Sequence, residues 1–430
     1  MKNKSSIKQQ LNRGIARAPI LVFLATFVLV VLAGMTVMLL YLKSENDTAA
    51  MNEGKSREEA IEDDRHVLDP LWEAIPEEVK QEEEADRGKY DDILSDPEYM
   101  RANRIYEKKG KKEGIISFGF AGDILFDDEY AVMASLLRRG VSIENGISEP
   151  LLAQMQDVDI MMVNNEFSYT DRGVPTEGKA YTFRGDTSTV SYLDDMGVDL
   201  VSLANNHVYD FGETGLLDTL DTLEQAGVPY VGAGRNLEEA AAPVYFISGD
   251  VKVAVVSATQ IERLDNPDTK GAGEGTPGVF RCWNPEKLYE VVADAKENSD
   301  FVIVYIHWGT ENVTEPDWAQ LEQSEGLAQA GADLIIGDHP HCLQGIQYYG
   351  DAPVFYSLGN FWFNSKTLDT GMVKVDISEN GIESLRFIPA IQSGCRTDLA
   401  YGDDKERIIA QLNGMSYDVT IDADGFITKN

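Results

Sequence analysis

The sequence predicts an α/β domain preceded by one N-terminal transmembrane helix. From about residue 113 onward, short runs of β-branched residues alternate with stretches of helical periodicity, which is the pattern of an α/β domain. Residues 20–42 form an apolar run of 23 residues without a charge. As a helix this run extends about 34 Å, enough to cross a hydrocarbon core of roughly 30 Å.

The expected strands are short, and polar residues follow several of them. They cover residues 115–121, 158–163, 200–203, 228–231, 251–257, 301–306, 334–336 and 354–357, with a β-rich tail that includes 373–377. The clearest helix spans 213–226, where leucines repeat on one face and Gly227 supplies a C-terminal stop. Two more helices are expected over 285–297 and 316–330, each beginning with a proline that suits a first helical turn.

Composition excludes several classes of protein. The chain has 430 residues, 43% of them hydrophobic, so it can bury a substantial core and is not disordered as a whole. Its 73 acidic and 37 basic residues give a formal net charge of −36, which repels a phosphate backbone, so nucleic acid is not an expected partner. The three cysteines are odd in number, far apart and without a C-x-x-C, so neither a disulfide framework nor a thiolate zinc site is expected.

The N-terminal region divides into three segments. Residues 1–19 carry basic residues and no acid, whereas acids follow the apolar run, so the positive-inside rule keeps this tail in the cytoplasm. The apolar run is longer than that of a signal peptide and no clear cleavage site precedes Lys43, which favours an uncleaved anchor. Residues 43–112 are expected to form an acidic extracytoplasmic stalk. We therefore expect a single-pass protein of the cell membrane whose domain, residues 113–430, is extracellular.

Several residues that can bind a metal ion lie at the ends of expected strands. They comprise two carboxylates, one carboxamide and four of the five histidines: Asp123, Glu166, Asn206, His207, His307, His339 and His341. In open α/β sheets the carboxyl ends of the strands form one rim where ligands bind, so these side chains are expected to converge. A single histidine is more often a hydrogen-bonded structural residue, but this mixed nitrogen and oxygen set suits a divalent Mn, Zn or Fe ion.

Further residues are candidates for binding a substrate. Arg184, in the segment YTFRGD, can clamp a carboxylate or phosphate with its guanidinium, although a plain surface arginine beside Asp186 is an equal alternative. Trp308 and Glu311, in HWGTEN, can line the pocket, although Trp308 can equally pack beneath a neighbouring histidine. Asn205 completes this set.

Six segments resemble sequences of the CapA family, in which they occur in the same order and with nearly the same residues. They are FGFAGDILFDD, VNNEFSYTDRG, LVSLANNHVYDFGETGLLDTLDTLEQAGVPYVGAG, YIHWGTEN, GADLIIGDHPHCLQGIQYY and FYSLGNFWFN, within residues 116–364. That family comprises capsule and poly-γ-glutamate synthesis proteins with a calcineurin-like metallophosphoesterase fold. The resemblance therefore implies a sandwich of two β-sheets flanked by helices.

The resemblance also implies roles for single residues. One or two metal ions would be held by Asp123, Glu166, Asn206, His307, His339 and His341. His207 would be the catalytic general acid, in the Asn-His pair of the phosphoesterase motif. Metallophosphoesterases carry a histidine two positions after the first aspartate, whereas this sequence has Leu125, so one metal site lacks a ligand. A single metal, or a second one held by Asp127 or water, remains open.

Two functions follow from the resemblance. Metal ions offset the charge of two carboxylates, so an anionic substrate can bind despite the overall charge, and they activate water. The first function is a metal-dependent hydrolase or transferase that acts on an anionic polymer, such as poly-γ-glutamate or capsular polysaccharide, beside a membrane-bound polymer synthase. The alternative is a non-catalytic, metal-containing component that binds or exports the polymer, which Leu125 favours somewhat. A plain structural scaffold would leave the histidine cluster unexplained.

Overall fold

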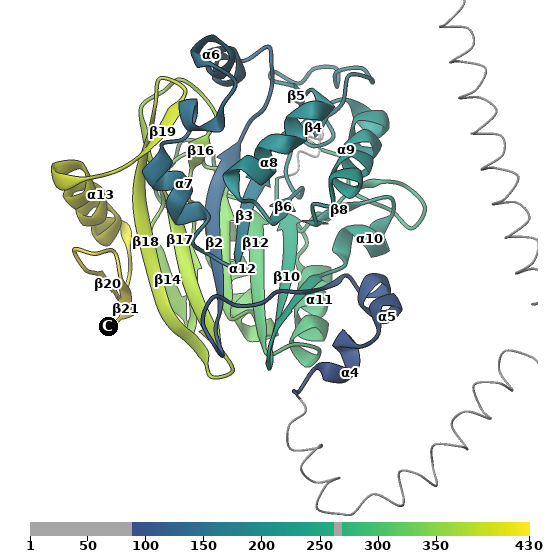
Figure 1. Cartoon of the computed structure of the whole chain (residues 1–430), viewed down its shortest axis with the longest axis vertical. Helices are drawn as coiled ribbons and strands as arrows, with labels where there is room; N and C mark the ends of the chain where they lie inside the picture. Colours follow the sequence, from purple (N-terminus) through teal and green to yellow (C-terminus); the bar gives the residue numbers. More distant parts are fainter. Residues whose placement is uncertain (1–87, 262–268) are drawn as a thin grey trace, which may run out of the picture. The chain divides into compact units, whose positions relative to one another are not determined.

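The computed structural model describes residues 88–261 and 269–430 (Figure 1). The expected cytoplasmic tail, the anchor at 20–42 and most of the expected stalk lie outside these residues. Within the described part of the chain, none of the helices has both the length and the apolar character needed to cross a membrane.

Two mixed β-sheets carry the fold. In spatial order the first sheet consists of β1 (Ile105–Glu107), β9 (Val244–Ser248), β10 (Val251–Thr259), β12 (Phe301–His307), β13 (Leu334–Asp338), β15 (Ala352–Phe355) and β14 (Ile346–Tyr349). The second consists of β19 (Arg396–Leu399), β18 (Gly381–Ser393), β17 (Leu368–Ser378), β2 (Ile116–Ile124), β3 (Ile160–Asn165), β6 (Leu200–Ser202) and β7 (Tyr230–Val231), with β16 (Asn360–Trp362) paired to β2. The central strands of each sheet run parallel, so their carboxyl ends lie at one edge.

The sheets pack face to face around a common core. Phe118 and Phe120 of β2 and Ile303 and Tyr305 of β12 belong to one buried apolar cluster. Helices cover the two outer faces (Figure 1). They are α6 (Ala131–Arg139), α7 (Glu149–Met155), α8 (Ser191–Met196) and α9 (Gly212–Ala226) on the second sheet, and α10 (Leu237–Ala241), α11 (Glu286–Glu297) and α12 (Trp318–Ala330) on the first. The expected sandwich of two sheets flanked by helices is confirmed.

The remaining elements are short or lie at the margins. They are α4 (Asp91–Leu94), α5 (Pro97–Ala102), β4 (Ser168–Tyr169), β5 (Arg184–Gly185), β8 (Ala233–Gly234), β11 (Gly278–Val279), α13 (Gly402–Met415), β20 (Val419–Ile421) and β21 (Ile427–Lys429). Ile408 and Leu412 of α13 join the core between the sheets.

All nine expected strands overlap an observed strand, and the expected helix at 213–226 is α9, which ends at Gly227 with φ +73°. The two prolines have a different role from the one expected. Pro285 precedes the first residue of α11, and Pro316 lies outside α12, whose start is fixed by a capping box between Asp317 and Gln320.

The folded unit begins earlier than expected. It includes the residues from Gly88 onward, whereas the sequence suggested a stalk to residue 112. The acid-rich composition concealed two features: β1 extends the first sheet by pairing in parallel with β9, and the residues before it are bound to the domain. Lys89 forms an ion pair with Asp300, and the Tyr90 hydroxyl donates to the same carboxylate at 2.7 Å.

Candidate metal centre

The alternation of side chains along the central strands places polar groups at the rim. In β12, Ile303 and Tyr305 face the core between the sheets, and His307 is the next residue on that face. Asp338 ends the inward face of β13 in the same way, and Asn164 that of β3. The buried apolar core therefore ends in polar side chains that the fold directs toward one another.

The first group of potential ligands gathers around His307. Its Nε2 lies 3.0 Å from Nδ1 of His339, 2.8 Å from Oδ1 of Asn206 and 3.5 Å from Oε1 of Glu166. The ligand atoms of Glu166, His307 and His339 all lie within 4.8 Å of one another. Four atoms with lone pairs thus converge on one point, as ligands of a divalent ion do.

A second group shares one member with the first. The ligand atoms of Asp123, Glu166 and His341 also lie within 4.8 Å of one another. Nδ1 of His341 is 3.1 Å from Oδ2 of Asp123 and 2.8 Å from Oδ1 of Asn360. Because Glu166 belongs to both groups, one carboxylate stands between two potential ion sites.

Glu166 provides the test of whether a cation fits. It is fully buried, and neither carboxylate oxygen has a hydrogen-bond partner among the described residues. Leaving such a group unpaired costs several kcal/mol, so buried carboxylates are normally bonded to donors or to metals. Burial, together with the charges of Asp123 and Asp338, raises the pKa of Glu166 well above its usual range. A divalent cation would supply the missing partner, so the residues present fit a metal centre.

The histidines of the first group are in the protonation state that binds metal. Burial lowers the pKa of His307 to about 3 and lowers that of His339 well below its usual value. Both rings are therefore neutral near pH 7 and offer a lone pair. Burial also lowers the pKa of His341, but the hydrogen bond and charge of Asp123 outweigh it, and the net shift is upward.

Two residues outside the expected ligand set support the centre. Nδ1 of His307 lies 2.8 Å from Oδ1 of Asp338, whose Oδ2 accepts a hydrogen bond from the Tyr305 hydroxyl at 2.9 Å. A carboxylate in this position fixes the ring and leaves Nε2 for a metal. Asn164 donates from Nδ2 to Oδ1 of Asp123 at 2.9 Å. Each of them lies at the end of a strand, and this position was the signal that could have identified both residues.

His207 lies beside the centre and is held by a carboxylate. Its Nδ1 is 2.7 Å from Oδ2 of Asp210, and Phe183 covers its ring at 4.3 Å between centroids. Lys179 forms an ion pair with Asp210 at 2.5 Å and donates to the backbone carbonyl of Asn206. Lys179, which the sequence also did not indicate, thus connects the loop carrying Asn206 to the partner of His207.

The structure places the candidate substrate-binding residues in different surroundings. Asn205 is fully buried, donates to Oδ1 of Asn164 at 2.9 Å and accepts from the backbone amide of His207 at 3.0 Å, so it shapes the loop instead of facing a substrate. Trp308 is fully buried on the outer face of β12 and donates to the Tyr356 carbonyl at 2.9 Å. The prediction that Trp308 lines a pocket is therefore wrong, because alternation turns it away from His307.

Arg184 and Glu311 do not belong to the ligand groups. The Arg184 guanidinium lies over the Phe211 ring at 4.9 Å, and its backbone amide donates to Asp127 at 2.8 Å. Glu311 is exposed and lines a cavity of about 450 Å³ that also reaches His339.

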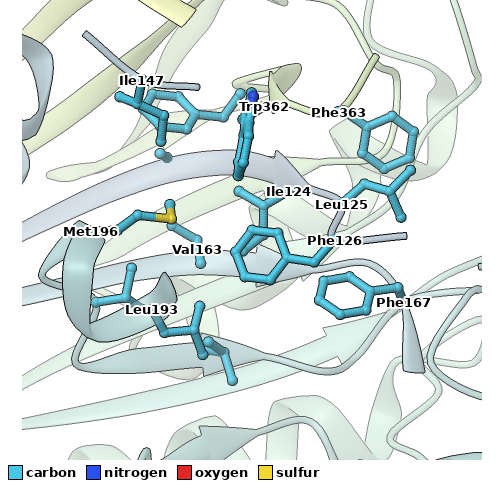
Figure 2. Packing of buried hydrophobic residues seen from close by; sticks show 14 of the residues in the cluster. Ile124, Leu125, Phe126, Ile147, Val163, Phe167, Leu193, Met196, Trp362 and Phe363 are labelled. Carbon is cyan, nitrogen blue, oxygen red and sulfur yellow. The ribbon is translucent and has the colours of Figure 1, made fainter. Parts of the chain in front are cut away.

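Leu125 lies two positions after Asp123, where the resemblance found in the sequence implies a histidine. It is fully buried in an apolar cluster with Phe126, Phe167 and Phe363 (Figure 2). Asp127 does not replace the missing ligand: its oxygens accept from the backbone amides of Glu129 and Arg184 at 2.8 Å each, and it belongs to none of the ligand groups found among the described residues.

The backbone is constrained at and near the residues that could bind a metal. His339 has φ +94° and His341 φ +57°, values that cost a non-glycine residue on the order of 1–3 kcal/mol. A Cβ atom on Gly122 would lie 1.9 Å from the Gly359 carbonyl oxygen, so glycine is required for the end of β2 to approach the segment that carries Asn360.

A model of the family described as bacterial capsule synthesis protein PGA_cap matches residues 117–365, which contain every residue of both ligand groups. The chain belongs to this family. The resemblance to CapA proteins found in the sequence is thus confirmed.

Individual relatives of the family align with parts of the chain. The capsule biosynthesis protein CapA of Bacillus anthracis is 34% identical over 232 residues, 52% of this chain and 55% of that protein. The PGA biosynthesis protein CapA of Bacillus subtilis (strain 168) is 29% identical over 300 residues, 68% of this chain and 76% of that protein. The chain therefore spans about half the length of the first relative.

Among solved structures, 5'-nucleotidase from Candida albicans SC5314 matches with a TM-score of 0.35 and 13% identity. The match covers 66% of this chain and 53% of that one and supports no conclusion about fold or activity.

Proposed function

We propose that this protein is a metal-dependent hydrolase or transferase of the metallophosphoesterase type that acts in the production of poly-γ-glutamate or another anionic capsule polymer. The observation that carries the proposal is Glu166, a fully buried carboxyl that has no hydrogen-bond partner among the described residues and belongs to two groups of potential metal ligands. The names of the relatives, which refer to capsule and PGA biosynthesis, supply the biological setting.

Two sets of the chain's own residues would each hold one metal ion. Glu166, Asn206, His307 and His339 would hold one ion, and Asp123, Glu166 and His341 the other. The ions, when bound, would offset the substrate's negative charge and lower the pKa of water toward ~7.

His207 would serve the leaving group. Asp210 engages its Nδ1, which leaves Nε2 as the nitrogen that can donate a proton. A positioned general acid of this kind contributes roughly 10²–10⁴-fold in rate.

The proposal includes the location of the protein. The apolar run at 20–42 would anchor the chain in the cell membrane with the folded unit outside, beside a membrane-bound polymer synthase. This placement rests on the charge distribution around the run.

A non-catalytic role in binding or exporting the polymer is the second candidate. The observation that favours it is Leu125, which replaces a metal-binding histidine of the phosphoesterases by a buried apolar side chain. In that role the metal would only hold the carboxylates of the polymer.

Elemental analysis and one variant test the proposal. The purified full chain is expected to contain one or two equivalents of Mn, Zn or Fe. His207→Ala should keep the metal and the fold but lose roughly 10²–10⁴-fold in turnover and lower polymer output in cells. A protein without metal under replete conditions would contradict both candidates. Unchanged output in His207→Ala, with loss of output only in His307→Ala or His339→Ala, would favour the non-catalytic role.

A further inference from the structure

A cavity of about 450 Å³ opens beside the candidate metal centre. Its lining includes His339, one of the potential ligands, as well as Gln260, Glu311 and two tryptophans, Trp283 and Trp318. A group bound in this cavity would lie next to the centre without displacing its ligands.

One wall of the cavity is aromatic. Trp283 and Trp318 are 47% and 65% exposed, whereas Trp308 and Trp362 are fully buried. The two exposed rings meet edge to face, with centroids 6.4 Å apart and an interplanar angle of 87°. Two neighbouring tryptophans that keep this much surface in water indicate a surface that a ligand covers.

The charge of the cavity selects the kind of ligand. Glu311 and Asp317 are the charged residues in its described lining, which contains no lysine or arginine. Asp317 is committed to the backbone amides of Ala319 and Gln320 at the start of α12. Glu311 makes no hydrogen bond or ion pair with other described residues, so its carboxylate is available. Such a cavity repels the carboxylates of an anionic polymer and attracts a cation.

We propose that this cavity binds a primary alkylammonium group, with the alkyl stem against Trp283 and Trp318 and the cation beside Glu311. Aromatic faces and a carboxylate are the partners that an ammonium group prefers when it leaves water. The inference rests on the proposed function, since it assigns to the metal centre a substrate, or part of one, that carries an amine.

Titration of the full chain with n-pentylammonium, followed by saturation-transfer NMR at pH 7, tests the inference. n-Pentanol serves as the neutral probe of equal length. Pentylammonium should bind more tightly than pentanol. Trp318→Ala should weaken pentylammonium binding by about threefold to thirtyfold, and Glu311→Gln by about twofold to fivefold without weakening pentanol binding. Glu325→Gln, which removes the same charge from an exposed position on α12, should change neither.

Equal affinity for the two probes, or pentylammonium binding that neither variant alters, would overturn the inference. Glu311 and Glu325 are exposed, so loss of folding does not obscure these variants. The metal content of the same samples separates this inference from the proposed function. Ammonium binding by a protein that takes up no metal would contradict only the proposed function, whereas a metallated protein without preference for pentylammonium would contradict only this inference.

Discussion

At the scale of single residues, the arrangement depends on one buried carboxylate. Glu166 is a fully buried carboxyl whose oxygens have no hydrogen-bond partner among the described residues, and its raised pKa reflects the cost of ionising it there. We propose that Glu166, which belongs to two groups of potential ligands, serves the metal centre and not the stability of the fold.

Glu166→Gln should separate these two effects. The neutral amide removes the buried carboxyl's charge, so the metal-free variant should be at least as stable as the metal-free parent. Added Mn²⁺ should stabilise the parent by about 2.7 kcal/mol at a hundred times its Kd, and the variant far less. Thermal unfolding with EDTA and with Mn²⁺ measures both. A variant that gains as much stability from metal as the parent would show that Glu166 is not a ligand.

Asp338→Asn tests the support of His307. An amide can still contact the ring but cannot hold it as a carboxylate does, so metal affinity should fall by about 10- to 100-fold while the fold persists. Metal titration followed by competition with a chelator measures the change. Asp376→Asn, at a partly buried ion pair with Lys112, is the matched control and should leave metal affinity unchanged.

The residues of the centre could be predicted from sequence to the extent that each ends a strand. Asp123, Glu166, Asn206 and three histidines were expected at one rim, and the structure brings them together. Asp338 was missed and Trp308 was misplaced for the same reason. Which face of a strand a residue occupies depends on which neighbours form the core, and a pattern within one strand does not reveal it.

At the scale of elements, the centre is built where segments approach closely. The end of β2 and the segment before β16 touch through Gly122 and Gly359, and this contact brings Asp123 near Asn360. The sequence indicated these elements but not the contact between them.

Gly122→Ala should therefore destabilise the protein. Its Cβ would lie 1.9 Å from the Gly359 carbonyl oxygen, and moving two backbone segments apart costs about 1–3 kcal/mol or more. Gly414→Ala, in α13 with no atom within 4 Å of the new methyl group, should instead be neutral or stabilise by about 0.5–1 kcal/mol. Denaturant unfolding compares the two variants, and equal effects would refute the importance of the contact.

Elements of low apolar content were the ones that sequence patterns assigned poorly. Residues 91–107 form two short helices and a three-residue strand, and their acid-rich composition resembles that of a solvated segment. They pack onto the domain because β1 pairs with the edge strand β9 and Lys89 forms an ion pair with Asp300. Both partners lie more than a hundred positions away in the sequence.

At the scale of the whole molecule, charge governs the approach of a substrate. A formal charge of −36 repels a polyanion at long range, and only the cation centre would attract it. Salt screens the long-range repulsion more strongly than a contact inside the rim, because the Debye length shrinks to about 8 Å at 0.15 M.

Binding of poly-γ-glutamate should therefore strengthen as NaCl rises from about 0.02 to 0.15 M, the opposite of the behaviour of proteins that bind polyanions through basic surfaces. Affinity measured at both salt concentrations, with metal held constant, decides the question. Weaker binding at higher salt would mean that a basic surface, and not the rim, captures the polymer.

The place where the chain enters the folded unit has a practical consequence. Lys89 and Tyr90 are fastened to Asp250 and Asp300, which precede β10 and β12, while His307 lies at the other end of β12, about 20 Å away. A bead, a fluorophore or a fusion partner joined ahead of Gly88 would thus lie at the end of the domain opposite the potential metal ligands. The immobilised protein would keep these ligands accessible to a long polymer.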